Sequence, residues 1–316
     1  MKAQAIHFLE KHKAEIREIV VPDPAADEIQ IRCVANGICM GEVSLFNDIE
    51  TDRWPLPRIV GHEGVGVVEK VGKDVENYKE GDWAVCREWS TIYNIQAARS
   101  ARFSAPPKDP AIVITEPVDC IAGAIYSYDI MPGDRVLLIG AGYMGLLNVQ
   151  GLASCPLGEL VVCDIKQHNL DLAKKFGANK VINASTPEGK AELDAYRQRL
   201  FDLVVESSGA EGPLQQACFL TREGGRLALF GWHHGMRSVD FGEWHLRGLK
   251  VLNSSPVIST DRSISNTERA VRLMENGVID QTDLITHRYK FEDIQHAMEE
   301  STERAGNYIK GVLEFE

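Results

Sequence analysis

One short stretch of the sequence limits the possible folds more than any other. The apolar run at 136–139 leads directly into the glycine motif GAGYMG at 140–145, and a helical pattern follows. A buried strand, a glycine-rich turn and a helix in this order form the phosphate-binding unit of doubly wound sheets. The glycines permit a tight turn and the close approach of a pyrophosphate, whose charge is favoured at the helix N-terminus. The motif therefore predicts that the chain binds a dinucleotide.

The residue at the end of the second predicted strand indicates whether NAD or NADP is the expected dinucleotide. The strand ends at Asp164, nineteen positions after Gly145, where an acidic side chain accepts hydrogen bonds from the adenosine ribose. A 2′-phosphate would be repelled by this carboxylate, so NAD is expected, whereas Lys166 keeps NADP as the less favoured alternative. The residues expected to bind the cofactor are Gly140, Gly142, Tyr143, Met144, Gly145, Asp164, Lys166, Ser208 and Gly231.

An alternation of strands and helices surrounds the motif. Short apolar runs alternate with helical patterns from about position 133 to position 255. This alternation is typical of an α/β domain with a parallel, doubly wound Rossmann sheet. The predicted strands lie at 136–140, 160–164, 180–182, 201–209, 225–231 and 249–255, and two predicted helices lie at 169–178 and 213–221.

The two ends of the chain have a different pattern. The first third is rich in Val, Ile and Gly, with turn residues between short apolar runs, and this predicts mainly β structure. Helical patterns return at 266–277 and 291–302, and the last apolar run, at 310–315, predicts a closing strand.

Composition and charge exclude several classes of protein. The 316 residues are 44% hydrophobic and carry a formal net charge of −12. This composition is ordinary for a globular protein, and the acidic balance does not suit nucleic acid or an anionic membrane as a partner. No apolar run approaches the roughly 18 to 20 residues of a membrane span, and the charged N-terminus has no signal-peptide core. A cytoplasmic location is expected, in which the seven cysteines, with no CxxC pair, are reduced thiols.

A set of potential metal ligands lies in the first part of the chain. Cys39, His62, Glu63 and Glu116 offer a thiolate, an imidazole and two carboxylates, and a catalytic zinc needs three such ligands and an open position. Because the spacing is long, each residue also has an ordinary structural interpretation. Cys39 could be a small buried thiol, His62 a core histidine with its hydrogen bonds satisfied, and Glu116 a surface carboxylate.

The order of the motifs resembles the zinc-dependent medium-chain alcohol and polyol dehydrogenases, in particular their sorbitol-dehydrogenase-like members. The resemblance covers essentially the whole chain. It implies a GroES-like, mainly β catalytic domain over 1–121 and 257–316, a Rossmann NAD-binding domain over 122–256, and a catalytic zinc between them. It rests on Cys39, GHEGVGVVEKVG at 61–72, EGDWAV at 80–85, Glu116-Pro117, the glycine motif, VVCDIK at 161–166, FGA at 176–178, VVESSG at 204–209 and GGRLALFG at 224–231.

The resemblance also assigns the metal site. Cys39 and His62 match the family's zinc ligands. Glu63 matches an adjacent Glu that binds either the zinc itself or a residue that lies just outside the zinc ligands. Glu116 stands in an EP pair, where sorbitol-dehydrogenase-like members have a Glu near or on the metal and enzymes for simple alcohols more often have Cys. A carboxylate there favours polyol, sugar or amino-alcohol substrates. Whether Glu63 or Glu116 is the third ligand stays open.

One departure from the family pattern affects the expected catalytic residues. Members often read Cys-Gly-Thr/Ser-Asp, whereas this chain reads CMGE at 39–42, so Gly41 replaces the hydroxyl that usually relays the substrate proton. Glu42 is expected to replace the Asp that orients the zinc-binding His. Ser44, a chain of water molecules, or Glu63 could carry the proton instead.

Two further segments differ from the family. The segment 87–103 lacks the four-cysteine cluster of the family's structural zinc, so one zinc per chain is expected. The segment 231–245 is unusually rich in Trp and His, and it follows a strand end where ligands bind in such sheets. Core positions are expected for most of the tryptophans, and surface-loop positions are an equal alternative for the two histidines. The candidate pocket residues are Trp54, Trp89, Trp232, His233, His234, Trp244 and Arg288.

The predicted activity is hydride transfer between NAD and a secondary alcohol of a polyol, sugar or amino-alcohol, with zinc as the Lewis acid. One alternative is a zinc-independent NADPH quinone or enoyl reductase of the same superfamily, which the proposed ligands and Asp164 disfavour. Another is a catalytically inactive NAD-binding sensor, favoured only by Gly41. The family implies a homodimer or homotetramer formed through the strand at 249–255, and no nucleic-acid or membrane partner.

Overall fold

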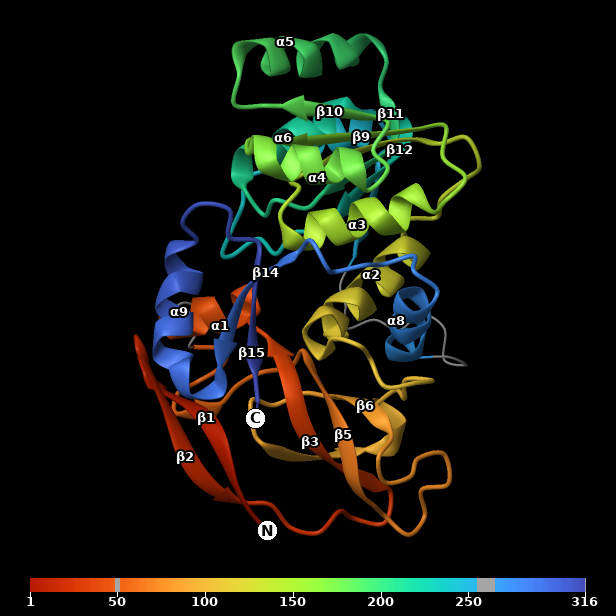
Figure 1. Cartoon of the computed structure of the whole chain (residues 1–316). Coiled ribbons are helices and arrows are strands. Elements are labelled where there is room, and N and C mark those ends of the chain that lie inside the picture. The colour runs from red at the N-terminus through yellow and green to blue at the C-terminus, as the bar shows by residue number, and fades with distance from the viewer. Residues whose placement is uncertain (49–51, 255–264, 316) are drawn as a thin grey trace. The chain divides into compact units, whose positions relative to one another are not determined.

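The computed structural model describes residues 1–48, 52–254 and 265–315, and contacts divide the chain into two compact units. The first unit comprises Met1–Asp119 and Thr267–Glu316, and the second comprises Cys120–Asn266 (Figure 1). Both ends of the chain thus belong to one unit. Position 257, where the sequence predicts the return to the catalytic domain, lies outside the described residues, as does Ser255 at the end of the last predicted Rossmann strand.

The second unit is built on a parallel sheet with the strand order β10-β9-β8-β11-β12-β13. Counted along the chain this is 3-2-1-4-5-6, the order of a Rossmann fold, which confirms the predicted doubly wound sheet. The strand order reverses between β8 and β11, where nucleotides bind in such folds. The strands are β8 (Arg135–Ile139), β9 (Glu159–Asp164), β10 (Lys180–Asn183), β11 (Phe201–Glu206), β12 (Thr221–Leu229) and β13 (Lys250–Asn253).

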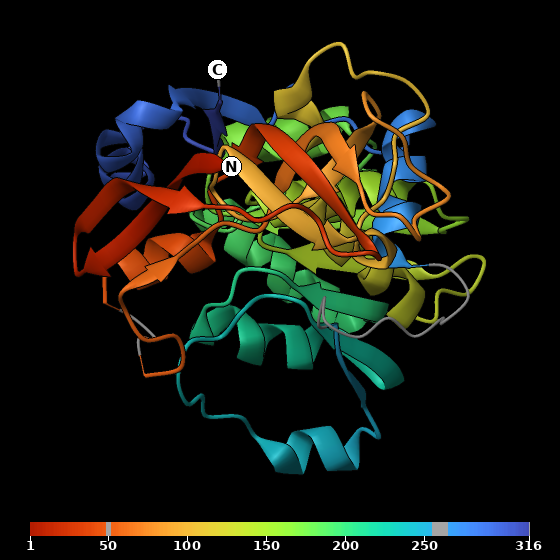
Figure 2. The same cartoon turned by 90° about the horizontal axis from the view of Figure 1, so that it is seen from below.

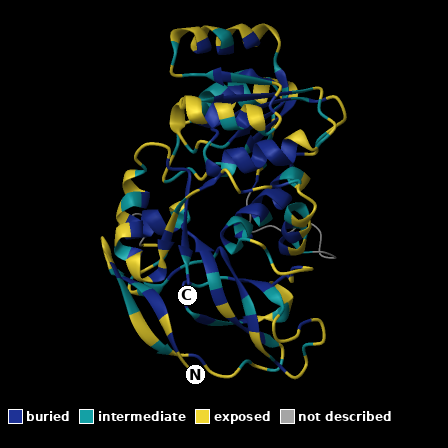
Figure 3. Cartoon of the chain, viewed as in Figure 1, coloured by how far each residue is buried: buried dark blue, intermediate teal, exposed yellow. Residues whose placement is uncertain are grey.

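Helices connect the strands of this sheet. Because parallel crossovers are right-handed, α3 and α4 cover one face and α6 covers the other. The central strands are buried on both sides, as Figure 3 shows, which is why they read as continuous apolar runs. The helical segments are α2 (Glu116–Ser127), which begins in the first unit, α3 (Tyr143–Ala153), α4 (Gln167–Lys175), α5 (Pro187–Ala195), η3 (Tyr196–Gln198), α6 (Glu211–Leu220) and α7 (Phe241–Leu246).

The first unit contains two sheets. The larger has the order β14-β15-β3-β5-β6, with β7 also paired to β3, and the smaller has the order β2-β1-β4. Strand β15, from the end of the chain, is antiparallel to β3 from its beginning, so tertiary pairing joins the two segments of this unit. The strands are β1 (Lys2–Glu10), β2 (Lys13–Val20), β3 (Glu28–Gly37), β4 (Arg58–Ile59), β5 (Gly64–Val71), β6 (Trp83–Cys86), β7 (Ile92–Gln96), β14 (Ile285–Lys290) and β15 (Lys310–Glu314).

Three α-helices are assigned to the first unit among the described residues. Helix α1 begins directly after its N-cap, Cys39. Helix α9 lies against β2, where Gln295 accepts a hydrogen bond from the backbone of Ala14 at 3.1 Å (Figure 2). A core that includes Phe8, Phe46 and Trp89 fills this unit. The helical segments are α1 (Met40–Phe46), η1 (Ala97–Arg99), η2 (Pro110–Val113), α8 (Asn266–Glu275), whose first residue belongs to the second unit, η4 (Phe291–Asp293) and α9 (Ile294–Glu303).

Some elements were not predicted from the sequence. Helix α5 lacks an apolar stripe because it is mostly polar, and the β1–β2 hairpin was not identified although parts of its strands alternate polar with apolar residues, as half-exposed strands do. The start of α5 does carry a local signal, since Thr186 caps it and Pro187 is its first residue. Strand β12 begins at Thr221, earlier than expected, because its hydrogen bonds to β11 begin there through polar residues.

Within the described parts of the chain, no helix has the length and apolar character that crossing a membrane requires.

Candidate metal and dinucleotide sites

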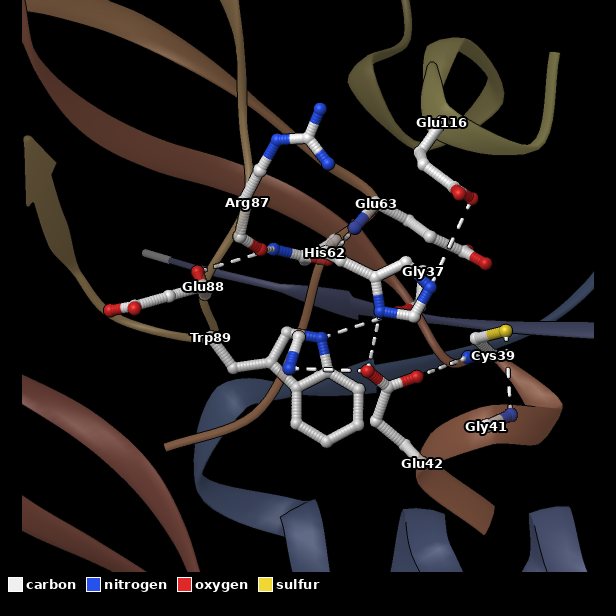
Figure 4. A network of polar contacts seen from close by, with 12 residues as sticks. Gly37, Cys39, Gly41, Glu42, His62, Glu63, Arg87, Glu88, Trp89 and Glu116 are labelled. Atoms are coloured by element: carbon white, nitrogen blue, oxygen red, sulfur yellow. Dashed lines mark hydrogen bonds and ion pairs between the residues drawn. The ribbon is translucent and has the colours of Figure 1, made fainter. Parts of the chain in front are cut away.

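Three potential metal ligands converge beside helix α1. Cys39 is the N-cap of α1, and His62 and Glu63 directly precede β5. One sulfur, one imidazole nitrogen and one carboxylate oxygen of these residues lie within 4.8 Å of one another, and Figure 4 shows the side chains together. No other group of three or more His, Cys, Asp and Glu side chains meets this criterion in 1–48, 52–254 and 265–315. The structure thus brings together three of the four ligands named from the sequence.

Glu42 fixes the orientation of two of these ligands. Its Oε1 accepts a hydrogen bond from Nδ1 of His62 at 2.6 Å, and its Oε2 accepts one from the backbone N–H of Cys39 at 3.2 Å. The sulfur of Cys39 accepts a hydrogen bond from the backbone of Gly41 at 3.4 Å, so Cys39 and Glu42 form a capping box at the start of α1. Because Nδ1 of His62 is occupied, Nε2 is the ring nitrogen available to a metal.

The turn before His62 requires a glycine. Gly61 has φ +101°, and a Cβ there would lie 2.3 Å from Cδ1 of Trp89. Trp89 is fully buried, and its Nε1 donates to the carbonyl of Gly37 at 3.2 Å. Trp89 therefore packs in the core beneath the metal-ligand cluster, and core packing is the interpretation that holds for this tryptophan.

Glu116 lies near the cluster of three ligands without being part of it. It is the first residue of α2, and its Oε2 lies 3.9 Å from Nε2 of His62, on the side opposite Glu42 in Figure 4. Its side chain is about one-fifth exposed, whereas that of Glu63 is 2% exposed. Glu63 is therefore the carboxylate already gathered with the thiol and imidazole, and Glu116 is a second carboxylate within reach.

The sequence analysis missed a cation that touches Glu63. Nζ of Lys310 lies 2.5 Å from Oε2 of Glu63, and both side chains are buried. Burial alone would lower the pKa of Lys310, but the carboxylate of Glu63 more than offsets this, so that pKa is raised. A lysine at the start of an otherwise apolar strand was the available signal, because lysines are seldom buried unless paired.

Charges in the cluster act strongly on one another. Burial raises the pKa of the Cys39 thiol, and the neighbouring His62 opposes this only in part. Burial also disfavours a charged imidazole, but Glu42 and Cys39 outweigh it and raise the pKa of His62 well above its usual value. The pKa of Glu42 is lowered despite its burial, because His62 stabilises the carboxylate. A metal ion must displace protons from the thiol and the imidazole to bind here.

The donor set fits zinc. A sulfur, an imidazole nitrogen whose partner nitrogen is hydrogen-bonded to a carboxylate, and a carboxylate oxygen are the ligand types of catalytic zinc sites. The carboxylate oxygen Oε2 of Glu63 is buried, and its contact is the ammonium of Lys310. The donor set itself, rather than an unpaired oxygen, supports a metal ion at the cluster.

The residues considered for proton transfer, at positions 41, 44 and 63, differ in whether they contact the ligand cluster. Gly41 presents only its backbone, and a Cβ there would have Sγ of Cys39 as its nearest neighbour, 3.8 Å away. Ser44 is buried on α1, and in the described residues no hydrogen bond links its hydroxyl to Cys39, His62 or Glu63. Glu63 is therefore the one of the predicted carriers that the structure places within the ligand cluster.

The dinucleotide motif forms the turn between β8 and α3. Gly140 has φ +98°, and a Cβ at Gly145 would lie 1.9 Å from the carbonyl oxygen of Gly140, so both positions require glycine. Gly142 is the N-cap of α3, and a Cβ there would have no atom within 4 Å. This open approach to a helix N-terminus is the geometry that a pyrophosphate needs. Tyr143 is buried, and Met144 is partly exposed on the first turn of α3.

Asp164 lies at the carboxyl end of β9, next to the motif. Its carboxylate accepts hydrogen bonds from the backbone N–H of Ala141 at 2.6 Å and of Lys166 at 2.8 Å. These bonds hold the carboxylate beside the glycine turn, while the side chain of Lys166 is exposed. The pair thus lies where an adenosine ribose is recognised in Rossmann folds.

A buried carboxylate organises the other predicted cofactor residues. Glu206, at the end of β11, accepts hydrogen bonds from the backbone and hydroxyl of Ser208, and its Oε2 lies 2.8 Å from Nε2 of His233. A Cβ at Gly231 would lie 3.0 Å from Oε2 of Glu206 and 2.5 Å from the backbone nitrogen of Gly209. The sequence analysis named Ser208, Gly231 and His233 but missed Glu206, which is fully buried.

The remaining candidate pocket residues are dispersed. Trp54 and Trp244 pack against the cores of the first and second units. Trp232 is half-exposed and stacks on His234, with ring centroids 5.2 Å apart. Arg288 forms ion pairs with Asp109 and Glu314 at the surface.

Two family models match the chain. The model described as the alcohol dehydrogenase GroES-like domain matches residues 25–141, and the model described as a zinc-binding dehydrogenase matches residues 144–276. Together they cover most of both units, and they confirm the GroES-like fold that the sequence predicts beside the Rossmann sheet.

Known proteins resemble the chain over its whole length. It is 25% identical to the L-threonine 3-dehydrogenase of Anaeromyxobacter dehalogenans (strain 2CP-C), with 94% of each chain covered. It is 24% identical to the sorbitol dehydrogenase of Bacillus subtilis (strain 168), with 98% of this chain and 96% of the relative covered. The crystal structure of an Escherichia coli oxidoreductase/dehydrogenase of unknown specificity has the same fold, with a TM-score of 0.89, 22% identity and 100% of both chains covered.

Proposed function

Since this chain belongs to the zinc-type medium-chain alcohol and polyol dehydrogenase family, we propose that it transfers a hydride between NAD and a secondary alcohol of a polyol, sugar or amino-alcohol. The observation that carries the proposal is the convergence of Cys39, His62 and Glu63, with Glu42 on the far side of the imidazole. Oxidoreductase chemistry is common to the family. The cofactor, the metal and the substrate class are the parts that need a test.

Within this proposal, the metal ligands are Cys39, His62 and Glu63, with Glu116 as the nearby second carboxylate. A zinc ion in such a site supplies Lewis-acid activation of a hydroxyl or carbonyl oxygen, and a nicotinamide supplies the hydride acceptor. Glu42 keeps the imidazole in a fixed orientation, which supports tight metal binding. Because Gly41 offers no hydroxyl and Glu63 would be held by the metal and by Lys310, a chain of water molecules is the proposed route for the proton that leaves the substrate.

NAD is proposed as the cofactor because a carboxylate, that of Asp164, is held beside the glycine turn. It would accept hydrogen bonds from ribose hydroxyls and repel a 2′-phosphate. Lys166 keeps its side chain exposed nearby, so NADP remains the less favoured cofactor.

The proposed substrate class rests on the carboxylates of the site and on the relatives. Enzymes for simple alcohols often have Cys at the position of Glu116, and a carboxylate can accept hydrogen bonds from additional hydroxyl or amino groups. One relative is named for a polyol, sorbitol, and another for an amino-alcohol, L-threonine. These two compounds are therefore the first substrates to test.

A second function is favoured by Gly41 alone. Without the usual relay hydroxyl, the chain would bind NAD without turnover and act as a sensor. The zinc-independent reductase is disfavoured, because such an enzyme has no physical need for a thiol, an imidazole and a carboxylate within 4.8 Å.

The decisive experiment combines metal content with turnover. Purified protein is expected to contain one zinc per chain and to reduce NAD with at least one member of a panel that includes sorbitol and L-threonine. Cys39→Ser should lose both the metal and the activity, whereas Cys155→Ser, at a partly exposed thiol of the second unit, should lose neither. A metal-free wild type with full activity would refute the role of zinc. Stabilisation by NAD without turnover of any alcohol would favour the sensor.

The domain roles, assembly and location complete the proposal. The first unit would be the catalytic domain and the second the NAD-binding domain. Assembly into a homodimer or homotetramer would use β13, which is last in the described strand order and would pair with its copy across the interface. Light scattering that finds a monomer at micromolar concentration would refute it. A cytoplasmic location is proposed because all seven cysteines are free thiols.

A further inference from the structure

A buried lysine reaches the metal-ligand cluster from the other end of the chain. Lys310 is the first residue of β15, and its Nζ lies 2.5 Å from Oε2 of Glu63. Only 5% of the lysine side chain and 2% of the glutamate side chain are exposed. Bulk water therefore solvates neither charge, and each one is stabilised mainly by opposite charge inside the protein.

The backbone around Glu63 is shaped for its carboxylate. A Cβ at Gly37, the last residue of β3, would lie 1.9 Å from Oε2 of Glu63, so any larger residue would displace the carboxylate. The backbone N–H of Glu63 donates to Oδ1 of Asn36 at 3.1 Å. Val312 of β15 pairs with Gly37, so the pairing of β15 with β3 brings Lys310 to this carboxylate. Glu63 is thus held at its backbone and at its carboxylate by two different strands.

The charges of the cluster show why a positive charge is needed next to Glu63. When a metal is bound, the thiolate of Cys39 and the carboxylate of Glu63 face a divalent cation, and Glu42 and Glu116 add negative charge close by. When no metal is bound, the buried carboxylate of Glu63 still needs a positive charge. The ammonium of Lys310 supplies one at contact distance.

We propose that Lys310 is a positioning residue that keeps Glu63 at its ligand position before the metal arrives, by supplying the positive charge that the metal later reinforces. This inference rests on the metal site of the proposed function. Loss of the ammonium should weaken the metal-free protein much more than the metal-loaded protein, because the ion then compensates Glu63. A lysine that only packed in the core would contribute equally to both forms.

The test compares melting temperatures of the full chain after treatment with a chelator and after loading with Zn²⁺. Lys310→Met, which has a similar length and no charge, should lower the melting temperature of the metal-free form by about 5 to 10 °C. Zinc should restore most of this loss. Lys310→Arg keeps the charge and should retain most of the stability of the wild type. Lys70→Met is the control, because Lys70 forms an exposed ion pair of the same 2.5 Å length with Asp23, and it should shift neither form.

A double variant isolates the pair. Glu63→Gln combined with Lys310→Met leaves no unpaired buried charge, so its metal-free form should be more stable than that of Lys310→Met alone. If Lys310→Met does not fold without metal, recovery of a folded metal-free protein in the double variant and in Lys310→Arg supports the proposal.

Three results separate the possible failures. Equal losses for Lys310→Met in both forms would overturn the role of Lys310, as would a double variant no more stable than the single one. A wild-type chain that zinc does not stabilise would overturn the metal site itself, and with it the proposed function.

Discussion

Oε1 of Glu42 lies 2.6 Å from Nδ1 of His62, so a carboxylate orients the imidazole of the candidate metal site from behind. The same side chain caps helix α1 through the backbone of Cys39. One residue therefore couples a helix start to the geometry of two ligands that lie far apart in the sequence. This arrangement is what a precise metal site requires, because ligands that are already oriented lose less freedom on binding.

Replacement of Glu42 by Gln should weaken metal binding by about 10- to 100-fold. The Gln side chain has nearly the same shape as that of Glu. It lacks the negative charge that strengthens the hydrogen bonds from Nδ1 of His62 and from the backbone N–H of Cys39. Zinc dissociation constants from chelator competition measure the effect. Glu69→Gln is the matched control, because Glu69 of β5 forms an exposed ion pair with Arg32 of β3, and the zinc affinity of this variant should equal that of the wild type. Equal affinities for the Glu42 variant and the wild type would contradict the orienting role.

Metal affinity should rise with pH. Burial raises the pKa of Cys39, and Glu42 helps to raise the pKa of His62, so both groups hold protons at neutral pH in the metal-free state. Metal binding releases these protons and is favoured as pH increases, by about tenfold per pH unit for each proton displaced. Competition measurements at pH about 6.5, 7.5 and 8.5 test this slope. A dissociation constant independent of pH would show that the site is already deprotonated.

Asp164→Asn should shift the cofactor preference from NAD toward NADP. The amide oxygen can still accept the hydrogen bond from Ala141, so the turn should keep its shape while the repulsion of a 2′-phosphate disappears. The NADP/NAD ratio of kcat/KM is expected to rise by on the order of tenfold, equivalent to about 1.4 kcal/mol.

Asp171→Asn, on the exposed face of α4, is the control for this cofactor test and should leave the ratio unchanged. A ratio that stays at the wild-type value in the Asp164 variant would mean that another residue selects the cofactor.

Trp89 should be important for stability. It is fully buried, and its indole N–H donates to the carbonyl of Gly37 beside the ligand cluster. Trp89→Phe removes this donor and part of the ring, with an expected cost of about 1 to 3 kcal/mol in the free energy of unfolding, and Trp89→Ala should cost about 3 to 5 kcal/mol. Urea denaturation measures both. Trp232→Phe, at a half-exposed tryptophan, should cost less than about 0.5 kcal/mol, and equal losses at the two positions would refute the assignment of Trp89 to the core.

Local sequence patterns were sufficient for the Rossmann unit. The buried strand before Gly140, the glycine turn and Asp164 lie within one short segment, and each has a steric or electrostatic reason for its residue type. The alternation of strands and helices predicted a parallel, doubly wound sheet, and the order of its strands came from the structure. Helix α5 was missed because its stability comes from caps and packing rather than from an apolar stripe.

The metal site could be predicted from the sequence less completely than the Rossmann unit. The sequence alone supplied the ligand types at Cys39, His62, Glu63 and Glu116, and the resemblance to the family assigned these residues to a zinc site. It was the fold that separated the carboxylates, by gathering Glu63 with the thiol and imidazole and leaving Glu116 beside them.

The sequence by itself determined the dinucleotide turn and the chemical types of the candidate ligands, because backbone sterics and side-chain chemistry are properties of short segments. Only the tertiary structure decided that Lys310 meets Glu63, because that contact requires β15 to pair with β3 in one register from opposite ends of the chain. Pairing of this kind depends on the whole packed sheet, and no local pattern in either strand encodes it.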